Sequence, residues 1–204
     1  MPSIEVFADV WCPFTHFGLQ RFVHHRAELG PEVTLVVRAW PLELVNGRPL
    51  DADFVAEEIA DIRAQVAPDL FAGFDPARFP RTTLPALGLT AAAYRSSPAA
   101  GEAMALELRR RLFELGQDVS DPAVLAEVAS AHGVEGPGPD ARAVVEQEWA
   151  AGRDRGVVGS PHFFTPGGDF FCPALDVRRV EGHLCISADP EGFDRFIAGC
   201  FAAG

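Results

Sequence analysis

The first forty residues alternate between strand and helix patterns, and this order constrains the fold more than any other part of the chain. The segment 4–9 alternates in strand fashion, and a helical pattern then runs from Pro13 to the pair Gly30-Pro31. Apolar residues alternate again from 33 to 38. A strand, a helix and a strand in so short a stretch predict a βαβ unit with parallel strands and a right-handed crossover.

The rest of the chain divides into a long helical stretch and a short region of strands. From about Asp51 to about Asp154 the apolar spacing is helical throughout. Two strands around the turn Pro166-Gly167-Gly168 then predict a β-hairpin, and Asp189-Pro190 begins a last helix. We therefore expect an α/β fold in which a helical domain, residues 51–154, interrupts a domain formed by residues 1–50 and 155–204.

The strand-to-helix junction of the βαβ unit carries a cysteine. Cys12 precedes Pro13, which suits the first helical position because its missing N–H is not needed there. The helix dipole and free backbone N–H groups favour a thiolate at this place, which points to thiol chemistry. Thr15 stands where a C-x-x-C motif would have its second cysteine. Its hydroxyl is expected to donate a hydrogen bond to the Cys12 thiolate and help hold its pKa down.

Composition excludes several classes of function. The chain has 29 acidic and 17 basic residues and a formal net charge of −12, which disfavours binding to nucleic acids and to anionic membranes. The sequence shows no signal-peptide pattern and no apolar run of membrane-spanning length, so we expect a soluble, cytoplasmic protein. In a reducing compartment the four cysteines are expected to be thiols, although a Cys172–Cys185 pair is geometrically possible.

Four stretches, in order along nearly the whole chain, resemble one known family. They are residues 9–15 (DVWCPFT), 41–44 (PLEL), 116–126 (GQDVSDPAVLA) and 156–161 (GVVGSP). The chain is similar to the DsbA-like oxidoreductases, whose thioredoxin fold (βαβ…ββα) is interrupted by a helical domain. The cytoplasmic, FrnE-like branch of that family is related to the 2-hydroxychromene-2-carboxylate isomerases and the kappa-class glutathione transferases.

The resemblance implies roles for residues on both sides of the site. It implies that Ser160-Pro161 is a cis peptide facing Cys12, and that the Ser160 backbone holds a peptide or thiol ligand beside the sulfur. The expected catalytic residues are Cys12, Thr15 and Pro161. Residues expected to contact the substrate are Pro13, Phe14, Ser160, His16 and His162.

The two histidines leave alternatives open. His16 lies four residues after Cys12 on the same helix face, and His162 follows Pro161. With Cys12 they could form a zinc site, or one of them could activate the thiol. The simpler interpretation, a solvated or hydrogen-bonded side chain, is favoured for each, so no metal is predicted.

Two further groups have a structural and a functional interpretation. Phe71, Phe74 and Phe79 are expected to pack in the core rather than line a substrate cleft. The run 109–111 (RRR) is expected to be a solvated helix face rather than a receptor for the carboxylates of a thiol ligand.

These observations favour a thiol-disulfide oxidoreductase in which Cys12 is the nucleophile and an external thiol resolves the mixed disulfide. No tightly bound cofactor is expected; glutathione or mycothiol is the expected co-substrate, and a small thiol or a protein disulfide the expected partner. A thiol-cofactor-dependent isomerase or transferase is the main alternative, and a non-catalytic thioredoxin-like binding module is the other. A homodimer is compatible with each.

Overall fold

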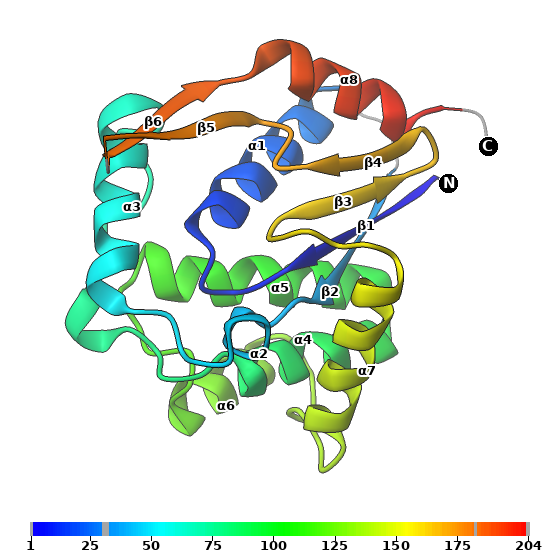
Figure 1. Ribbon diagram of the computed structural model, residues 1–204. Helices are drawn as coiled ribbons and strands as arrows, with labels where there is room; N and C mark the ends of the chain where they lie inside the picture. Colours follow the sequence, from blue (N-terminus) through cyan, green and yellow to red (C-terminus); the bar gives the residue numbers. More distant parts are fainter. Residues whose placement is uncertain (1, 30–32, 182, 203–204) are drawn as a thin grey trace.

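A mixed four-stranded sheet forms the centre of the computed structural model, which describes residues 2–29, 33–181 and 183–202 (Figure 1). The strands are β1 (Ser3–Ala8), β2 (Thr34–Ala39), β3 (His162–Thr165) and β4 (Gly168–Phe171), in the order β2-β1-β3-β4. β1 and β2 run parallel, and β3 pairs antiparallel with β1 and β4. The predicted βαβ unit and the hairpin are confirmed.

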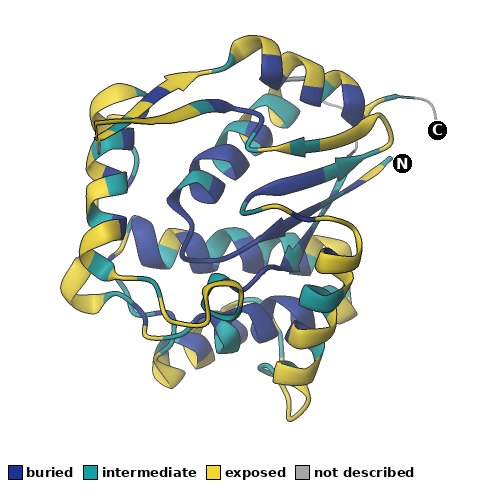
Figure 2. Cartoon of the chain, in the orientation of Figure 1, coloured by how far each residue is buried: buried dark blue, intermediate teal, exposed yellow. Residues whose placement is uncertain are grey.

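Helices account for every regular element between β2 and β3. α1 (Pro13–Leu29) connects β1 to β2, and its predicted end at Gly30-Pro31 lies outside the described residues. The other helices are α2 (Leu42–Asn46), α3 (Ala52–Gln65), η1 (Pro76–Arg78), α4 (Leu84–Ser96), α5 (Pro98–Phe113), α6 (Pro122–Ala131), α7 (Ala141–Asp154) and α8 (Pro190–Cys200). The helical insertion therefore has the predicted position. The division into two domains stays a prediction, because one continuous buried core joins the strands to these helices (Figure 2).

Local sequence explains where several helices begin. The carboxylate of Asp121 accepts a hydrogen bond from the Ala123 N–H, and that of Asp189 accepts one from Gly192 N–H. Each is followed by a proline at the first helical position, where no N–H is required. The cap at Asp189 is the start signal that the sequence predicted for α8.

The region before α8 contains a second hairpin that the sequence did not predict. β5 (Leu175–Val180) and β6 (His183–Ala188) form a separate two-stranded sheet. Both strands are largely exposed, and their apolar alternation is short: Leu175 and Val177 in β5, and Leu184 and Ile186 in β6. The hairpin extends to α3 (Figure 1), where the Gln65 side chain donates to the Leu184 carbonyl at 3.0 Å and accepts from the Ile186 N–H at 2.8 Å.

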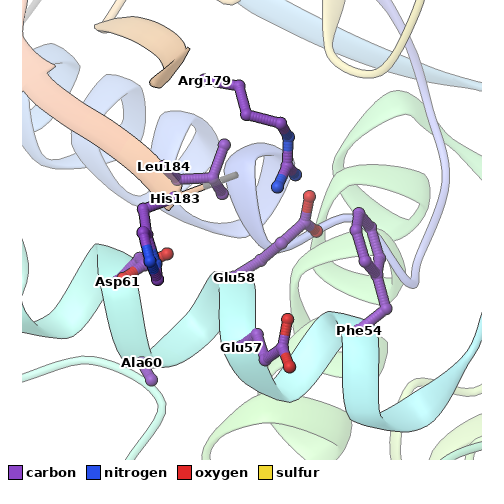
Figure 3. Close-up of a pocket in the computed structure, with 8 residues that line it drawn as sticks. All are labelled: Phe54, Glu57, Glu58, Ala60, Asp61, Arg179, His183 and Leu184. Carbon is purple, nitrogen blue, oxygen red and sulfur yellow. The ribbon is translucent and has the colours of Figure 1, made fainter. Parts of the chain in front are cut away.

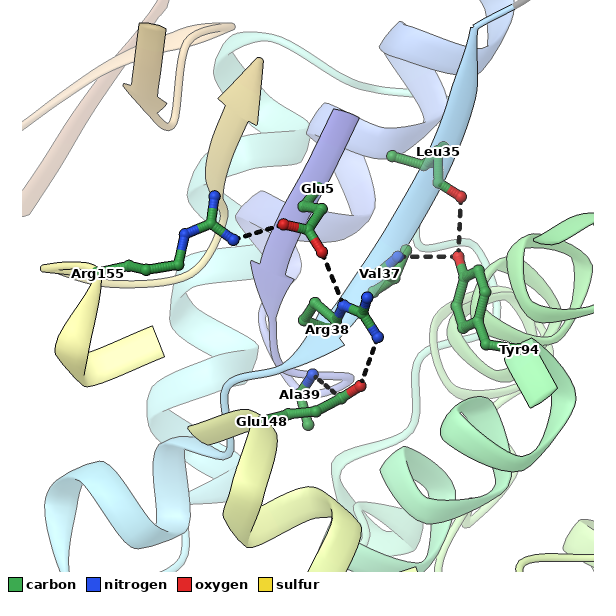
Figure 4. Close-up of polar contacts among 8 residues, drawn as sticks. All are labelled: Glu5, Leu35, Val37, Arg38, Ala39, Tyr94, Glu148 and Arg155. Atoms are coloured by element: carbon green, nitrogen blue, oxygen red, sulfur yellow. Dashed lines mark hydrogen bonds and ion pairs between the residues drawn. The ribbon is translucent and has the colours of Figure 1, made fainter. Parts of the chain in front are cut away.

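Polar side chains cover the outer edge of the sheet at β2 (Figure 4). The Tyr94 hydroxyl from α4 accepts from the Val37 N–H at 2.8 Å and donates to the Leu35 carbonyl at 3.1 Å. Glu148 from α7 accepts from the Ala39 N–H at 2.8 Å and from the Arg38 side chain at 3.0 Å. The N–H groups of Val37 and Ala39 and the carbonyl of Leu35 are thereby bonded within the molecule, which disfavours pairing with another strand at this edge.

A candidate active site at the start of helix α1

Cys12 lies in the loop that joins β1 to α1, immediately before Pro13. The side chain is almost fully buried, with 5% of its surface exposed. Its sulfur donates a hydrogen bond to the carbonyl oxygen of Ser160, and the two atoms are 3.0 Å apart. The Ser160–Pro161 peptide is cis, as the resemblance implied. The structure therefore brings together the two segments that the sequence singled out, 148 residues apart.

The hydroxyl of Ser160 connects the same residue to both ends of the Cys12 loop. The Asp9 N–H donates to it at 2.9 Å, and the Thr15 hydroxyl lies 2.8 Å from it. Thr15 is fully buried, so this bond is shielded from water. Ser160 thus contacts the loop through its carbonyl and its side chain, which fixes the position of Cys12.

The protonation of Cys12 differs from the expectation. Burial raises the pKa of the Cys12 thiol, and the nearby carboxylate of Glu58 also raises it. Hydrogen bonds from Thr15 and Ser160 act in the opposite direction, as predicted for Thr15, but burial outweighs them. The prediction of a low pKa was wrong because the helix start is enclosed by other elements, and a charge in such a place loses its hydration.

A small pocket opens beside Cys12. It has a volume of about 210 Å³ and is lined around the start of α1 by Cys12, Pro13 and Phe14, from α2, α3 and the segment between them by Leu42, Leu50, Phe54, Val55 and Glu58, and from the far side by Ser160. The lining is mainly apolar, and Glu58 is its only carboxylate. Pro13, Phe14 and Ser160 therefore lie where a ligand of Cys12 would contact them, and their binding role stays a prediction.

Glu58 also borders a second, more polar groove between α3 and the β5–β6 hairpin (Figure 3). The Glu58 carboxylate and the Arg179 guanidinium point toward each other there, with Glu57 and Asp61 on the same helix. Burial raises the pKa of Glu58 to about 7, and the charge of Arg179 opposes that rise. Glu58 was not among the predicted site residues, because only the tertiary fold brings α3 close to Cys12.

Behind the loop lies a buried pair of charged residues. The Asp9 carboxylate accepts hydrogen bonds from the N–H groups of Trp11 and Leu42. The Arg109 guanidinium donates to the Asp9 carbonyl at 3.1 Å and to the Ala105 carbonyl at 2.8 Å. Burial raises the pKa of Asp9 to about 6. A thiolate on Cys12 and the Arg109 cation attract each other, so this arginine favours the charged form of the thiol.

The position of Arg109 corrects the interpretation of the run 109–111 as a solvated face. Arg109 is 1% exposed, whereas Arg110 lies on the surface and pairs with Glu107. Arg111 is mostly covered and pairs with Glu107 and Glu127. The helical spacing contained the signal, since Arg109 lies four residues after Ala105 on the buried face of α5.

The two histidines have partners other than Cys12. His16 is buried, its Nε2 lies 2.8 Å from the Glu114 carboxylate, and its ring packs on Phe71 and Phe113. Burial lowers its pKa. The Nδ1 atom of His162 accepts from the Val158 N–H at 3.2 Å, and its Nε2 lies 3.1 Å from the Asp169 carboxylate. The interpretation as hydrogen-bonded histidines is confirmed.

The structure also places the phenylalanine cluster and the other cysteines. Phe71 is buried, and Phe74 and Phe79 pack against the core, so the phenylalanine cluster is structural. Cys172 and Cys185 are both free thiols and do not pair. Among the described residues no three histidine, cysteine or acidic side chains gather in a metal-binding arrangement. No helix in the described part of the chain has the length and apolarity needed to cross a membrane.

A family model for the DSBA-like thioredoxin domain matches residues 3–185. The chain therefore belongs to the DSBA-like thioredoxin family, with the interrupted thioredoxin fold that the resemblance implied. Among curated proteins no match is found.

Solved structures share this fold at low sequence identity. The cytosolic disulfide reductase DsbM from Pseudomonas aeruginosa is 15% identical, with a TM-score of 0.65, and the match covers 96% of this chain and 97% of that one. A structure of DsbM with GSH gives a TM-score of 0.61 at the same identity and coverage. A 2-hydroxychromene-2-carboxylate isomerase is 14% identical with a TM-score of 0.60, covering 83% and 88% of the two chains. A probable DsbA oxidoreductase from Streptomyces coelicolor is 19% identical with a TM-score of 0.58, covering 80% of each chain.

Proposed function

We propose that this protein is a cytoplasmic thiol-disulfide oxidoreductase whose nucleophile is Cys12. The observation that carries the proposal is the placement of the Cys12 sulfur at the start of α1, 3.0 Å from the Ser160 carbonyl and beside Pro161. Membership of the DSBA-like family supports it. The related DsbM is a disulfide reductase that has a structure with GSH, which supports a small thiol as partner.

The reaction begins with release of the Cys12 proton. The thiol donates to the Ser160 carbonyl in the free protein, so an N–H group of an extended substrate that bonds this carbonyl would displace the thiol from it. The thiolate is then stabilised by hydrogen bonds from Thr15 and Ser160 and by the charge of Arg109. It attacks one sulfur of a disulfide, which gives a mixed disulfide on Cys12 and releases the other half as a thiolate.

Thr15 cannot resolve the mixed disulfide, because a hydroxyl group does not attack a disulfide as a thiolate does. The mixed disulfide must therefore be resolved by a thiol from outside the C-P-F-T motif. Glutathione or mycothiol is the proposed co-substrate.

The test is glutathione-dependent reduction of 2-hydroxyethyl disulfide by the wild-type protein and by Cys12→Ser. We expect turnover by the wild type and none by Cys12→Ser. Cys185→Ser is the matched control and should be as active as the wild type, since Cys185 is an exposed residue of β6. Equal turnover by all three proteins would show that Cys12 is not the nucleophile.

The isomerase or transferase alternative has one supporting observation, the fold shared with a 2-hydroxychromene-2-carboxylate isomerase. That function needs the thiol cofactor to bind without forming a disulfide. Titration calorimetry and the reduction assay together separate the oxidoreductase from the isomerase or transferase. The isomerase or transferase would be favoured if the wild type and Cys12→Ser both bind reduced glutathione saturably and the wild type reduces no disulfide. A non-catalytic binding module would show neither.

A further inference from the structure

A second cysteine is held next to the cis peptide that Cys12 contacts. Cys172 follows directly after β4, and its N–H donates to the Pro161 carbonyl at 3.0 Å. The bond lies one residue beyond the last ladder pair, His162 and Phe171, where Cys172 leaves the strand in a left-handed conformation with φ +44°. Cys172 therefore lies directly beside Pro161.

Cys12 contacts the same dipeptide from α1, through the bond of its sulfur to the Ser160 carbonyl. The two cysteines thus flank adjacent residues, Ser160 and Pro161. The negative charge of a Cys12 thiolate raises the pKa of Cys172, so the two thiols lie within electrostatic range of each other.

Each of the two cysteines lines a pocket. Cys172 lines a pocket of about 380 Å³ together with Phe14, Ser160, Phe171, Leu175, Asp176 and Val177. Phe14 and Ser160 also line the pocket that contains Cys12. The two pockets therefore share Phe14 and Ser160 as lining residues.

The remaining cysteines are placed differently. Cys185 is exposed in β6, opposite Arg178 of β5. Cys200 is fully buried in α8 within the hydrophobic core. Cys172 is thus the thiol that shares a contact segment with Cys12.

We propose that Cys172 is the resolving cysteine of this site and takes the role for which Thr15 has no thiol. This rests on the proposed function. In the first step the Cys12 thiolate attacks a disulfide RS–SR′, which forms a Cys12–S–S–R bond and releases R′S⁻. In the second, the Cys172 thiolate attacks the Cys12 sulfur, which forms a Cys12–Cys172 disulfide and releases RS⁻. The substrate disulfide gains two electrons and the protein dithiol loses two. Two molecules of a small thiol then reduce the Cys12–Cys172 bond and leave as their disulfide.

The charge state of Cys12 affects the second step. Burial and a Cys12 thiolate together raise the pKa of Cys172 to about 12. Once Cys12 is in a mixed disulfide its sulfur carries no charge, so a Cys12 thiolate no longer raises the pKa of Cys172. Cys172 therefore becomes easier to ionise at the step in which it must attack, and a thiol of high pKa is a strong nucleophile once deprotonated.

The experiment treats the fully reduced wild type, Cys172→Ser and Cys185→Ser with oxidised glutathione, stops the reaction by acid at successive times, and maps peptides by mass spectrometry without reduction. We expect the wild type and Cys185→Ser to lose two hydrogens and to yield a peptide pair joined through Cys12 and Cys172. Cys172→Ser should instead accumulate glutathione on Cys12, with a mixed-disulfide lifetime at least tenfold longer. Cys172→Ala repeats the test if the serine variant is unfolded by circular dichroism, and the linkage in the wild type is a readout that needs no variant.

The failures are distinguishable. A wild type that keeps glutathione on Cys12 as long as Cys172→Ser does would overturn the role of Cys172 and leave the proposed function intact. A link from Cys12 to Cys185 would also overturn it. If Cys12 takes no glutathione in any of the proteins, the proposed function fails, and the role of Cys172 fails with it.

Discussion

The Cys12 thiol donates a hydrogen bond to the carbonyl oxygen of Ser160, and its sulfur lies 3.0 Å from that oxygen. The S–H group is the only donor of this side chain. When the thiol ionises this bond is lost, and the sulfur then faces the negative end of a carbonyl dipole. The contact that positions the sulfur therefore also opposes its ionisation, in the same direction as burial. Thr15, Glu58 and Arg109 surround this contact, and each leads to a separate expectation.

The first prediction concerns Thr15, whose hydrogen bond lowers the pKa of Cys12. Thr15→Val removes the donor and keeps the shape. A hydrogen bond to a charged group contributes about 1.5 kcal/mol, so the pKa of Cys12 should rise by roughly one unit. Alkylation by iodoacetamide at neutral pH should then slow about tenfold. In the wild type the rate should keep rising beyond the pH at which free cysteine has ionised.

Thr15→Ser is the control, because it restores a hydroxyl at the same position and should alkylate at nearly the wild-type rate. Equal rates for Thr15→Val and the wild type over the whole pH range would mean that the hydroxyl serves only Ser160, which it also contacts at 2.8 Å.

The second prediction concerns Glu58, whose carboxylate raises the pKa of Cys12. Glu58→Gln removes that charge, so Cys12 should alkylate faster than in the wild type. The pKa of Glu58 is itself raised to about 7, so the carboxyl is neutral below that pH. The two rate profiles should therefore coincide in acid and separate only above about pH 7. Arg179 and Asp61 also act on Glu58 and are unchanged by the substitution.

Glu57→Gln is the matched control, since it makes the same charge change one residue away on an exposed position of α3. If Glu57→Gln accelerates alkylation as much as Glu58→Gln, the effect comes from net charge and not from the pocket beside Cys12.

Sequence alone predicted the local parts of this site and missed those that depend on packing. The strand, the helix start at Pro13 and the placement of Cys12 follow from short-range patterns, and Ser160-Pro161 from the family resemblance. Glu58 was missed because its proximity to Cys12 arises when α3 packs beside α1. The pKa of Cys12 was predicted with the wrong sign because a helix start is visible in a sequence, whereas its burial is not. Arg109 was misjudged because a run of three arginines obscured its position on the buried stripe of α5.

The third prediction concerns the stability supplied by Arg109. Arg109→Met leaves the Asp9 carbonyl without its donor and the buried Asp9 carboxylate without a nearby cation. Loss of one partner of a buried charged pair costs about 3–5 kcal/mol, and urea denaturation should show a decrease of this size in the free energy of unfolding. Arg110→Met removes a surface ion pair with Glu107 and should cost less than about 1 kcal/mol. Similar losses for the two variants would contradict the structural role of Arg109.

The last prediction is a pH dependence of stability that originates in Asp9. Its pKa is raised from 3.8 to about 6 in the folded protein, because the carboxylate is fully buried. The folded state therefore binds the proton more tightly than the unfolded state does. This contribution to the free energy of unfolding is fully present below about pH 4 and is lost as the pH rises through 6. A difference of about two units corresponds to about 3 kcal/mol.

The side chain of Asp9→Asn cannot titrate. Between pH 4 and pH 6 the free energy of unfolding of the wild type should therefore fall by about 3 kcal/mol relative to that of the variant, and the difference should stay constant above that range. Other buried acids such as Glu58 titrate in both proteins and cancel in the comparison. Asp53→Asn, on an exposed turn of α3, controls for the loss of one acidic group and should follow the wild type throughout. A constant difference between the wild type and Asp9→Asn from pH 4 to pH 7 would show that Asp9 is ionised across this range. The carboxylate behind the Cys12 loop would then be held charged by Arg109 and its hydrogen bonds, in spite of its burial.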